Sequence, residues 1–128
     1  MWNLYWEEKM LPVDDKQKLL DAVERLNFEY EHKEPIFVQV ENQNGDRMCV
    51  GIGNGEGYSF IDFFPADNSY SKHVQGENCG EGTVCFAMGK EESEFYIHET
   101  ITYHTALQVL KTFLGDDKLD DSVEWIDD

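Results

Sequence analysis

Basic residues are scarce in this sequence: 10 lysines and arginines stand against 27 aspartates and glutamates, which gives a formal net charge of −17. A field of this sign repels nucleic-acid phosphates and anionic membrane surfaces, so we expect neither nucleic acid nor a membrane as a partner. It attracts a basic protein or divalent cations, and it also serves plain solubility.

Long apolar runs and an even set of cysteines are missing too. No run approaches the roughly 20 apolar residues that a membrane-crossing helix needs. The N-terminal stretch lacks the basic start and apolar segment of a secretory signal. Cys49 and Cys85 lie in apolar runs, where cysteine behaves as a small hydrophobe, and Cys79 leaves the count odd. We therefore expect a cytoplasmic protein with reduced cysteines.

The motifs of common catalytic and metal sites are absent. The sequence contains no His-Glu-x-x-His, no Cys-x-x-Cys and no Gly-x-Ser-x-Gly. The acidic segments Asn42–Asp46 and Asp116–Asp121 lack the ligand spacing of an EF-hand loop. The four histidines are dispersed, which indicates surface positions. We expect no metal, no cofactor and no enzymatic activity, although a nucleophile and base brought together by the fold stay open.

A glycine-rich stretch runs from Gly51 to Gly57. A dinucleotide-binding loop needs a third glycine where Glu56 stands, and it must open a helix. A P-loop needs a lysine after its last glycine, and Glu56 would repel a phosphate. The pattern instead predicts that Gly51 and Gly53 end a strand and that Asn54 to Gly57 form the turn into the next strand.

Two segments have helical periodicity. The first runs from Asp15 to Asn27, with Asp14 or Asp15 as its N-cap and leucine and valine on one face. The second runs from Tyr103 to Leu114, with Thr102 as its N-cap and Gly115 as its C-terminal stop. Both helices are amphipathic, so each should pack one face against a sheet.

The strands follow from β-branched and aromatic runs between turns. We expect Ile36–Val40, Met48–Ile52 and Tyr58–Phe64 to form an antiparallel meander, and Asp67–Gly82 to be a long loop. Other strands are expected at Trp2–Glu7, Thr83–Met88 and Glu94–Ile97, and Val123–Ile126 is either an edge strand or a tail. The sequence thus predicts one α+β domain over residues 1–128, with an antiparallel sheet of about five to seven strands and two main helices packed against it.

The order of these segments resembles the bacterial polymorphic-toxin immunity proteins of family one. The resemblance lies in Met48–Gly53, the aromatic strand ending near Phe64, the Ser71–Gly76 loop, Thr83–Phe86, Glu94, the Ala106–Phe113 helix and Val123–Trp125. It covers about Ile36 to Trp125. Trp125, Gly51 and Gly53 match the family pattern and are interpreted as structural residues.

The resemblance implies an inhibitor that forms a one-to-one complex with the C-terminal domain of a secreted toxin, often of the nucleic-acid deaminase type. A toxin of this kind needs a basic cleft for phosphates, which an acidic protein can occupy. The candidate contact residues combine acids and aromatics: Glu56, Tyr58, Asp62, Asp67, Tyr70, Glu77 and Glu81.

Two alternatives stay open at this level. One is a general acidic adaptor or nucleic-acid mimic that binds basic proteins without a dedicated partner, and its affinity would collapse with salt. The other is a small enzyme with an unrecognised site, which a deep pocket with convergent polar groups would favour.

Overall fold

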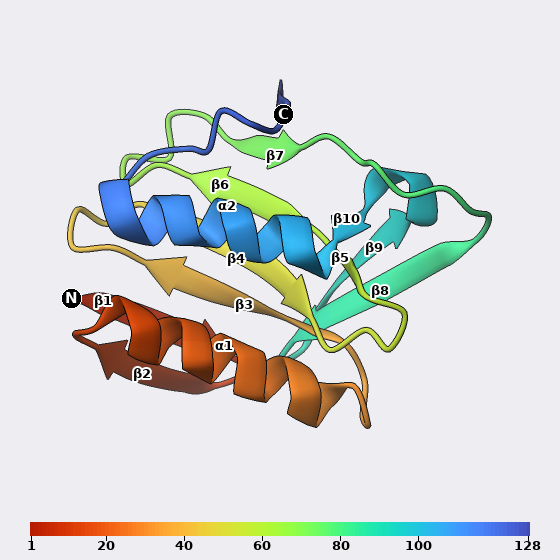
Figure 1. Cartoon of the computed structure of the whole chain (residues 1–128), viewed down its shortest axis with the longest axis horizontal. Coiled ribbons are helices and arrows are strands. Elements are labelled where there is room, and N and C mark those ends of the chain that lie inside the picture. Colours follow the sequence, from red (N-terminus) through yellow and green to blue (C-terminus); the bar gives the residue numbers. More distant parts are fainter.

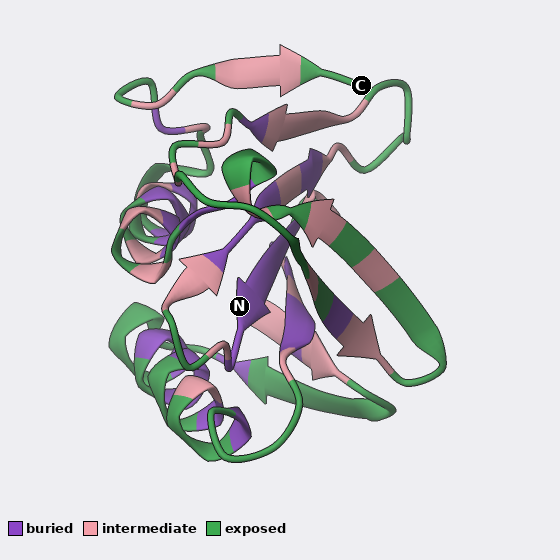
Figure 2. Cartoon of the chain, turned by 90° about the vertical axis from the view of Figure 1, so that its right-hand side faces the viewer, coloured by how far each residue is buried: buried purple, intermediate pink, exposed green.

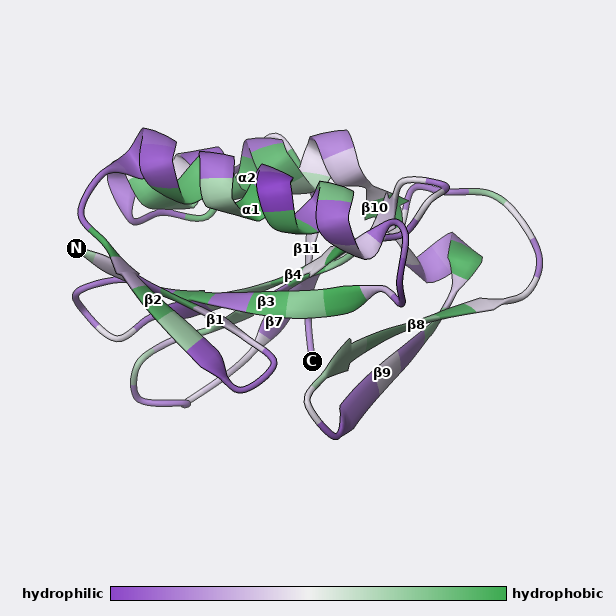
Figure 3. Cartoon of the chain, turned by 90° about the horizontal axis from the view of Figure 1, so that it is seen from below, coloured by the Kyte–Doolittle hydropathy of each residue, from purple (hydrophilic) through white to green (hydrophobic).

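The computed structural model describes all 128 residues. Two α-helices lie on one face of a nine-stranded, largely antiparallel sheet, as Figure 1 shows. Seen edge-on in Figure 3, both helices are on one side of the sheet and one hairpin extends from the opposite side. The predicted α+β class is confirmed, and the sheet has more strands than expected because several short edge strands extend it.

The elements have the following bounds. The main sheet contains β1 (Trp2–Trp6), β2 (Lys9–Val13), β3 (Ile36–Glu41), β4 (Arg47–Ile52), β6 (Ile61–Phe64), β7 (Lys72–Val74), β8 (Thr83–Met88), β9 (Glu91–Tyr96) and β11 (Trp125–Asp127). A separate ribbon pairs β5 (Tyr58–Ser59) with β10 (Ile101–Thr102). The helices are α1 (Lys16–Tyr30), α2 (Tyr103–Asp116) and the short 3-10 helix η1 (Ile97–Glu99). The strand order is β11-β7-β6-β4-β3-β1-β2, and β8 joins β3 while pairing with β9.

The meander predicted from the central strands is present, with one difference. β3, β4 and β6 pair antiparallel in succession. The run Tyr58–Phe64 is not one strand, because β5 leaves the sheet to pair with β10 while β6 stays with β4. The glycine stretch behaves as expected: Gly53 adopts a positive φ of 81°, and the Gly57 amide donates to the Asn54 carbonyl across the turn.

Three edge features were predicted wrongly. β2 was not among the expected strands, and it contains Pro12 at the sheet edge, where a missing N–H interrupts no ladder. The loop Asp67–Gly82 contains β7, which pairs with β6 and β11. The hairpin strand β9 begins at Glu91, three residues earlier than expected. The C-terminal segment forms an edge strand, one of the two alternatives predicted for it.

The helix N-caps were predicted correctly. The Asp15 carboxylate accepts hydrogen bonds from the amides of Gln17 and Lys18, and α1 runs past Asn27 to Tyr30. The Thr102 hydroxyl accepts from the Thr105 amide at the start of α2. Gly115 does not stop this helix. The C-cap is Asp117, whose φ of 53° is left-handed and whose amide donates to the Phe113 carbonyl.

The main core lies between the helices and the sheet. Alternate residues of the central strands, such as Val38 and Val50, face Val23 of α1 and Leu110 of α2 in one cluster of 23 buried residues. Burial is highest in β3 and β4, at the centre of the sheet (Figure 2). This layer leaves the opposite face of the sheet without a helical cover (Figure 3).

A second, smaller aromatic cluster lies on that opposite face, and it consists of Phe37, Cys49, Phe60 and Phe86. It is enclosed by the hairpin of β8 and β9, whose strand pairing with the rest of the sheet is a single parallel bridge between β3 and β8. Gly51 makes this contact feasible, because a Cβ at Gly51 would lie 2.8 Å from the Phe60 ring and 2.9 Å from the Phe86 ring. The hairpin therefore leaves the plane of the sheet and forms a wedge with it.

Candidate functional site

The open part of this wedge is a groove, which we call the hairpin groove. It consists of two hollows, of about 570 and 390 Å³, that share Phe60 and Asp62. The larger hollow is lined by Phe60, Ile61, Asp62, His73, Val74, Gln75, Gly76, Phe95, His98, Glu99, Ile126 and Asp128. The smaller is lined by Phe37, Gln39, Arg47, Cys49, Phe60, Asp62, Phe64, Asn68, Met88, Glu91 and Ser93.

The floor of the hairpin groove is one row of cross-strand neighbours. From β3 to β11 the row reads Gln39, Cys49, Asp62, His73 and Ile126. Residues paired in this way lie on the same face of a sheet, here the face away from the helices. Five strands therefore contribute one residue each to one surface.

Asp62 occupies the centre of this row. Burial raises the pKa of its carboxyl to about 6, the nearby negative charge of Asp128 adds to the rise, and His73 opposes it. No protein group donates a hydrogen bond to this carboxylate. A mostly buried charge without a hydrogen-bonded partner is costly to folding, so Asp62 is an energetically unfavourable residue for the isolated protein.

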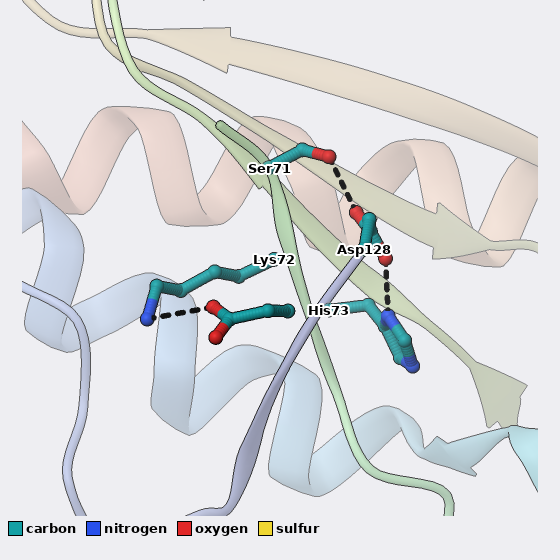
Figure 4. A network of polar contacts seen from close by, with 5 residues as sticks. Ser71, Lys72, His73 and Asp128 are labelled. Carbon is teal, nitrogen blue, oxygen red and sulfur yellow. Dashed lines mark hydrogen bonds and ion pairs between the residues drawn. The ribbon is translucent and has the colours of Figure 1, made fainter. Parts of the chain in front are cut away.

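A network of polar contacts holds the chain end at the rim of the groove (Figure 4). The Asp128 carboxylate accepts a hydrogen bond of 2.6 Å from the Ser71 hydroxyl, and its other oxygen lies 2.6 Å from Nδ1 of His73. Burial opposes ionisation of Asp128, but these hydrogen bonds and the His73 charge outweigh it and lower its pKa. Next to it, Lys72 pairs with Asp127 at 3.1 Å.

The seven predicted contact residues do not form one surface. Only Asp62 lies in the hairpin groove. Glu56 and Tyr58 line a separate hollow of about 320 Å³ beside the start of β8. Asp67 and Tyr70 lie in the loop between β6 and β7, where the Tyr70 ring is 6.3 Å from Phe63.

Glu77 and Glu81 lie in the segment between β7 and β8. The Glu77 carboxylate accepts hydrogen bonds from the Thr102 amide at 3.0 Å and the Thr105 hydroxyl at 2.7 Å, at the N-terminus of α2. Burial opposes its ionisation, yet these hydrogen bonds lower its pKa. The structure thus gives Glu77 a capping function. Glu81 is exposed in the loop before β8.

The comparison with family models is decisive at this point: the model for immunity protein Imm1 matches residues 7–127. The chain belongs to the Imm1 family. The match extends from the turn after β1 to the last strand, so it includes both helices and the whole hairpin. The comparison with curated proteins gives no match. The expected kinship with immunity proteins is confirmed.

Several groove residues of this Imm1 protein were missed from sequence. His73, Phe95, Ile126 and Asp128 line the larger hollow, although they lie on three different strands or beyond them. One signal in the sequence could have indicated the position of His73. It precedes the apolar Val74, and because neighbouring residues of a strand point to opposite faces, a buried Val74 would place His73 on the other face of the sheet. The sequence predicts separate surface positions for the four histidines, whereas His73 and His98 line the same hollow.

Cys49 is the cysteine that lines the hairpin groove of this Imm1 protein. Burial raises the pKa of the Cys49 thiol to about 12, so the group stays protonated at neutral pH. No group of three or more histidine, cysteine or acidic side chains is arranged to hold a metal ion. No helix has the length and apolar character needed to cross a membrane. The geometry is that of a shaped, mixed aromatic and acidic surface.

Proposed function

We propose that this Imm1 protein binds the C-terminal domain of a cognate bacterial toxin in a one-to-one complex and neutralises it by covering a basic active-site cleft. The toxin acts on nucleic acid, with deaminase chemistry as the leading class. The whole chain acts as one inhibitory domain in the cytoplasm, and it inhibits by occlusion, without catalysis of its own.

The observation that carries this proposal is an acidic surface that the protein does not neutralise itself. Of 27 acidic side chains, only four form ion pairs, with Lys18, Lys33, Lys72 and His73. The hairpin strand β9 alone carries Glu91, Glu92 and Glu94, and all three are exposed. The excess negative potential is therefore free to act on a partner.

A nucleic-acid enzyme must hold phosphates with lysine and arginine. Its cleft therefore has the potential that complements this surface. Complementary fields accelerate encounter and suppress wrong partners, while packed contacts at the centre of an interface slow dissociation. The aromatic side chains beside the acids of the hairpin groove provide such packing.

Co-expression with the toxin domain encoded beside this protein tests the proposal. Cells that express the active toxin should survive only when this protein is present, and a catalytically inactive toxin should leave cells viable in both cases. A well-folded protein that gave no rescue would contradict the proposed function.

A salt titration separates a dedicated inhibitor from a general acidic adaptor. The complex with the cognate toxin should persist from about 50 mM to about 500 mM NaCl, because only its long-range component is screened. An adaptor or nucleic-acid mimic would bind several unrelated basic proteins and would lose all of them over the same range.

A further inference from the structure

We propose that the hairpin groove is the surface that meets the toxin, and that an arginine side chain of the toxin's basic cleft enters it to pair with Asp62. This inference rests on the proposed function and specifies the contact surface and which of the candidate acids anchors the partner.

The groove is preformed and of suitable size. Its two hollows of about 570 and 390 Å³ share Phe60 and Asp62 in their walls, and each lies in the range of about 300–1,000 Å³ typical of binding pockets. The Phe60 ring stacks with Phe95 at 4.4 Å and contacts Phe86 at 5.2 Å, which fixes the closed end of the wedge. The hairpin that forms the wedge lies on the side of the sheet opposite both helices (Figure 3).

The charges of the groove identify the chemistry of its occupant. Four carboxylates line it, against one arginine and two histidines: they are Asp62, Glu91, Glu99 and Asp128. Arg47 does not satisfy Asp62, because its guanidinium donates to Asn68 and lies 5.5 Å from the Phe64 ring. His73 faces Asp128. Asp62 therefore has no hydrogen-bonded cation within the chain, and a basic partner can supply one.

Arginine fits this environment better than lysine does. Its planar guanidinium can meet a carboxylate through two parallel hydrogen bonds and can stack on an aromatic ring. Asp62 is flanked by Phe60 in both hollows, with Phe95 in one and Phe64 in the other. The internal pair of Arg47 and Phe64 shows that this floor already accommodates a guanidinium against an aromatic ring.

The cost of Asp62 to the isolated protein also supports a binding function. An uncompensated, mostly buried carboxylate destabilises the fold, and an apolar or amide side chain would avoid that cost. A partner cation that pairs with Asp62 would offset this destabilisation when the complex forms. Destabilising groups of this kind concentrate at binding and active sites.

The test compares the wild type with three variants in their binding kinetics with the purified toxin domain that is identified by rescue. Asp62→Asn keeps the shape of the side chain and removes its charge. Glu8→Gln removes one charge from the exposed turn between β1 and β2, at the opposite edge of the sheet from β6. Circular dichroism and thermal melting establish that each variant is folded.

We expect Asp62→Asn to weaken the complex by at least about tenfold, almost all of it through faster dissociation, because a desolvated charge pair is lost. Glu8→Gln should change the affinity by less than about twofold, since a distant exposed charge affects only steering. A third variant, Ser93→Trp, which places a large side chain in the smaller hollow, should also accelerate dissociation.

Two outcomes would overturn the inference and leave the proposed function intact. In the first, the wild type binds the toxin tightly and Asp62→Asn binds equally well. In the second, Asp62→Asn and Glu8→Gln weaken binding by the same factor. Asp62 would then contribute only to the overall negative potential of the protein and would not form a specific contact. A wild-type protein that did not bind the toxin at all would overturn both.

Discussion

The indole N–H of Trp125 donates a hydrogen bond of 2.8 Å to the backbone carbonyl of Asp120. The Asp120 carboxylate in turn accepts hydrogen bonds from the amide and hydroxyl of Ser122 and from the Thr112 hydroxyl of α2. This cluster fastens the C-terminal segment to α2 before β11 begins. The position of β11, and therefore of Ile126 and Asp128 in the hairpin groove, depends on it.

Asp120→Asn should destabilise the protein at neutral pH. Hydrogen bonds from Ser122 lower the pKa of Asp120, with further bonds from Thr112 and Gln108. The carboxylate therefore stabilises the fold above its unfolded pKa, and this contribution is lost as the pH falls through the lower folded value. We expect a loss of about 1–2 kcal/mol at about pH 7.

Urea unfolding of both proteins across pH checks this prediction. The difference between wild type and Asp120→Asn should shrink below about pH 4. The exposed neighbour Asp121 is the matched control, and Asp121→Asn should change stability by less than about 0.5 kcal/mol. A constant difference at all pH values would argue against the ionised carboxylate as the stabilising group.

Asp62→Asn should have the opposite effect on stability. The folded pKa of Asp62, about 6, lies above its ordinary value of 3.8, mainly because of burial. Its ionised form therefore destabilises the fold above the folded pKa, and the penalty is relieved as the pH falls between these values. The variant should be more stable than the wild type by up to about 3 kcal/mol at about pH 7.5.

Urea unfolding across pH also tests whether Asp62→Asn raises or lowers the free energy of unfolding. The two proteins should converge in stability as the pH falls below the ordinary pKa of 3.8, because the wild-type carboxyl is then protonated in both the folded and the unfolded state. A variant that was less stable than the wild type at neutral pH would show that Asp62 already has a compensating partner within the chain.

Tyr103→Phe should stabilise the protein. The Tyr103 hydroxyl is buried without any hydrogen-bond partner, and burial raises its pKa, as do the charges of Glu24 and Glu31. Removing an unsatisfied buried hydroxyl should gain about 1 kcal/mol in the free energy of unfolding. Tyr70 is 49% exposed and provides the control, since Tyr70→Phe should be close to neutral. A loss of stability in Tyr103→Phe would contradict the assignment of an unpaired hydroxyl.

Gly51→Ala should disturb the hairpin, and Gly55→Ala should not. A methyl group at Gly51 would lie under 3 Å from the Phe60 and Phe86 rings, whereas nothing lies within 4 Å of one at Gly55. Overpacking of this kind costs about 1–3 kcal/mol. Because Phe60 lines both hollows, Gly51→Ala should also weaken toxin binding. Thermal melting and binding measurements on both variants check this, and equal effects would contradict it.

The central architecture was accessible from sequence because local signals agreed there. β3, β4 and β8 are β-branched or aromatic runs bounded by turns, and the caps Asp15 and Thr102 are side chains that accept amide hydrogen bonds. The edge strands were not accessible. β7 has three residues and β2 contains a proline, so neither has a strong local preference, and pairing with neighbours decides their structure.

The hairpin groove could not be predicted from sequence for a related reason. Its floor depends on the register of five strands, which brings Cys49, Asp62, His73 and Ile126 into one row. Asp62 was a candidate contact because of its charge among aromatic residues. The Asp62 carboxylate is mostly buried and accepts no hydrogen bond. This environment results from the packing of the hairpin and could not be predicted from the sequence.

A crystal structure of this protein bound to its toxin domain tests the account most directly. We expect the toxin's basic cleft to cover the hairpin groove, with an arginine guanidinium within about 4 Å of the Asp62 carboxylate. A complex in which the toxin sat on the helical face, or presented a neutral or acidic surface to the groove, would contradict it.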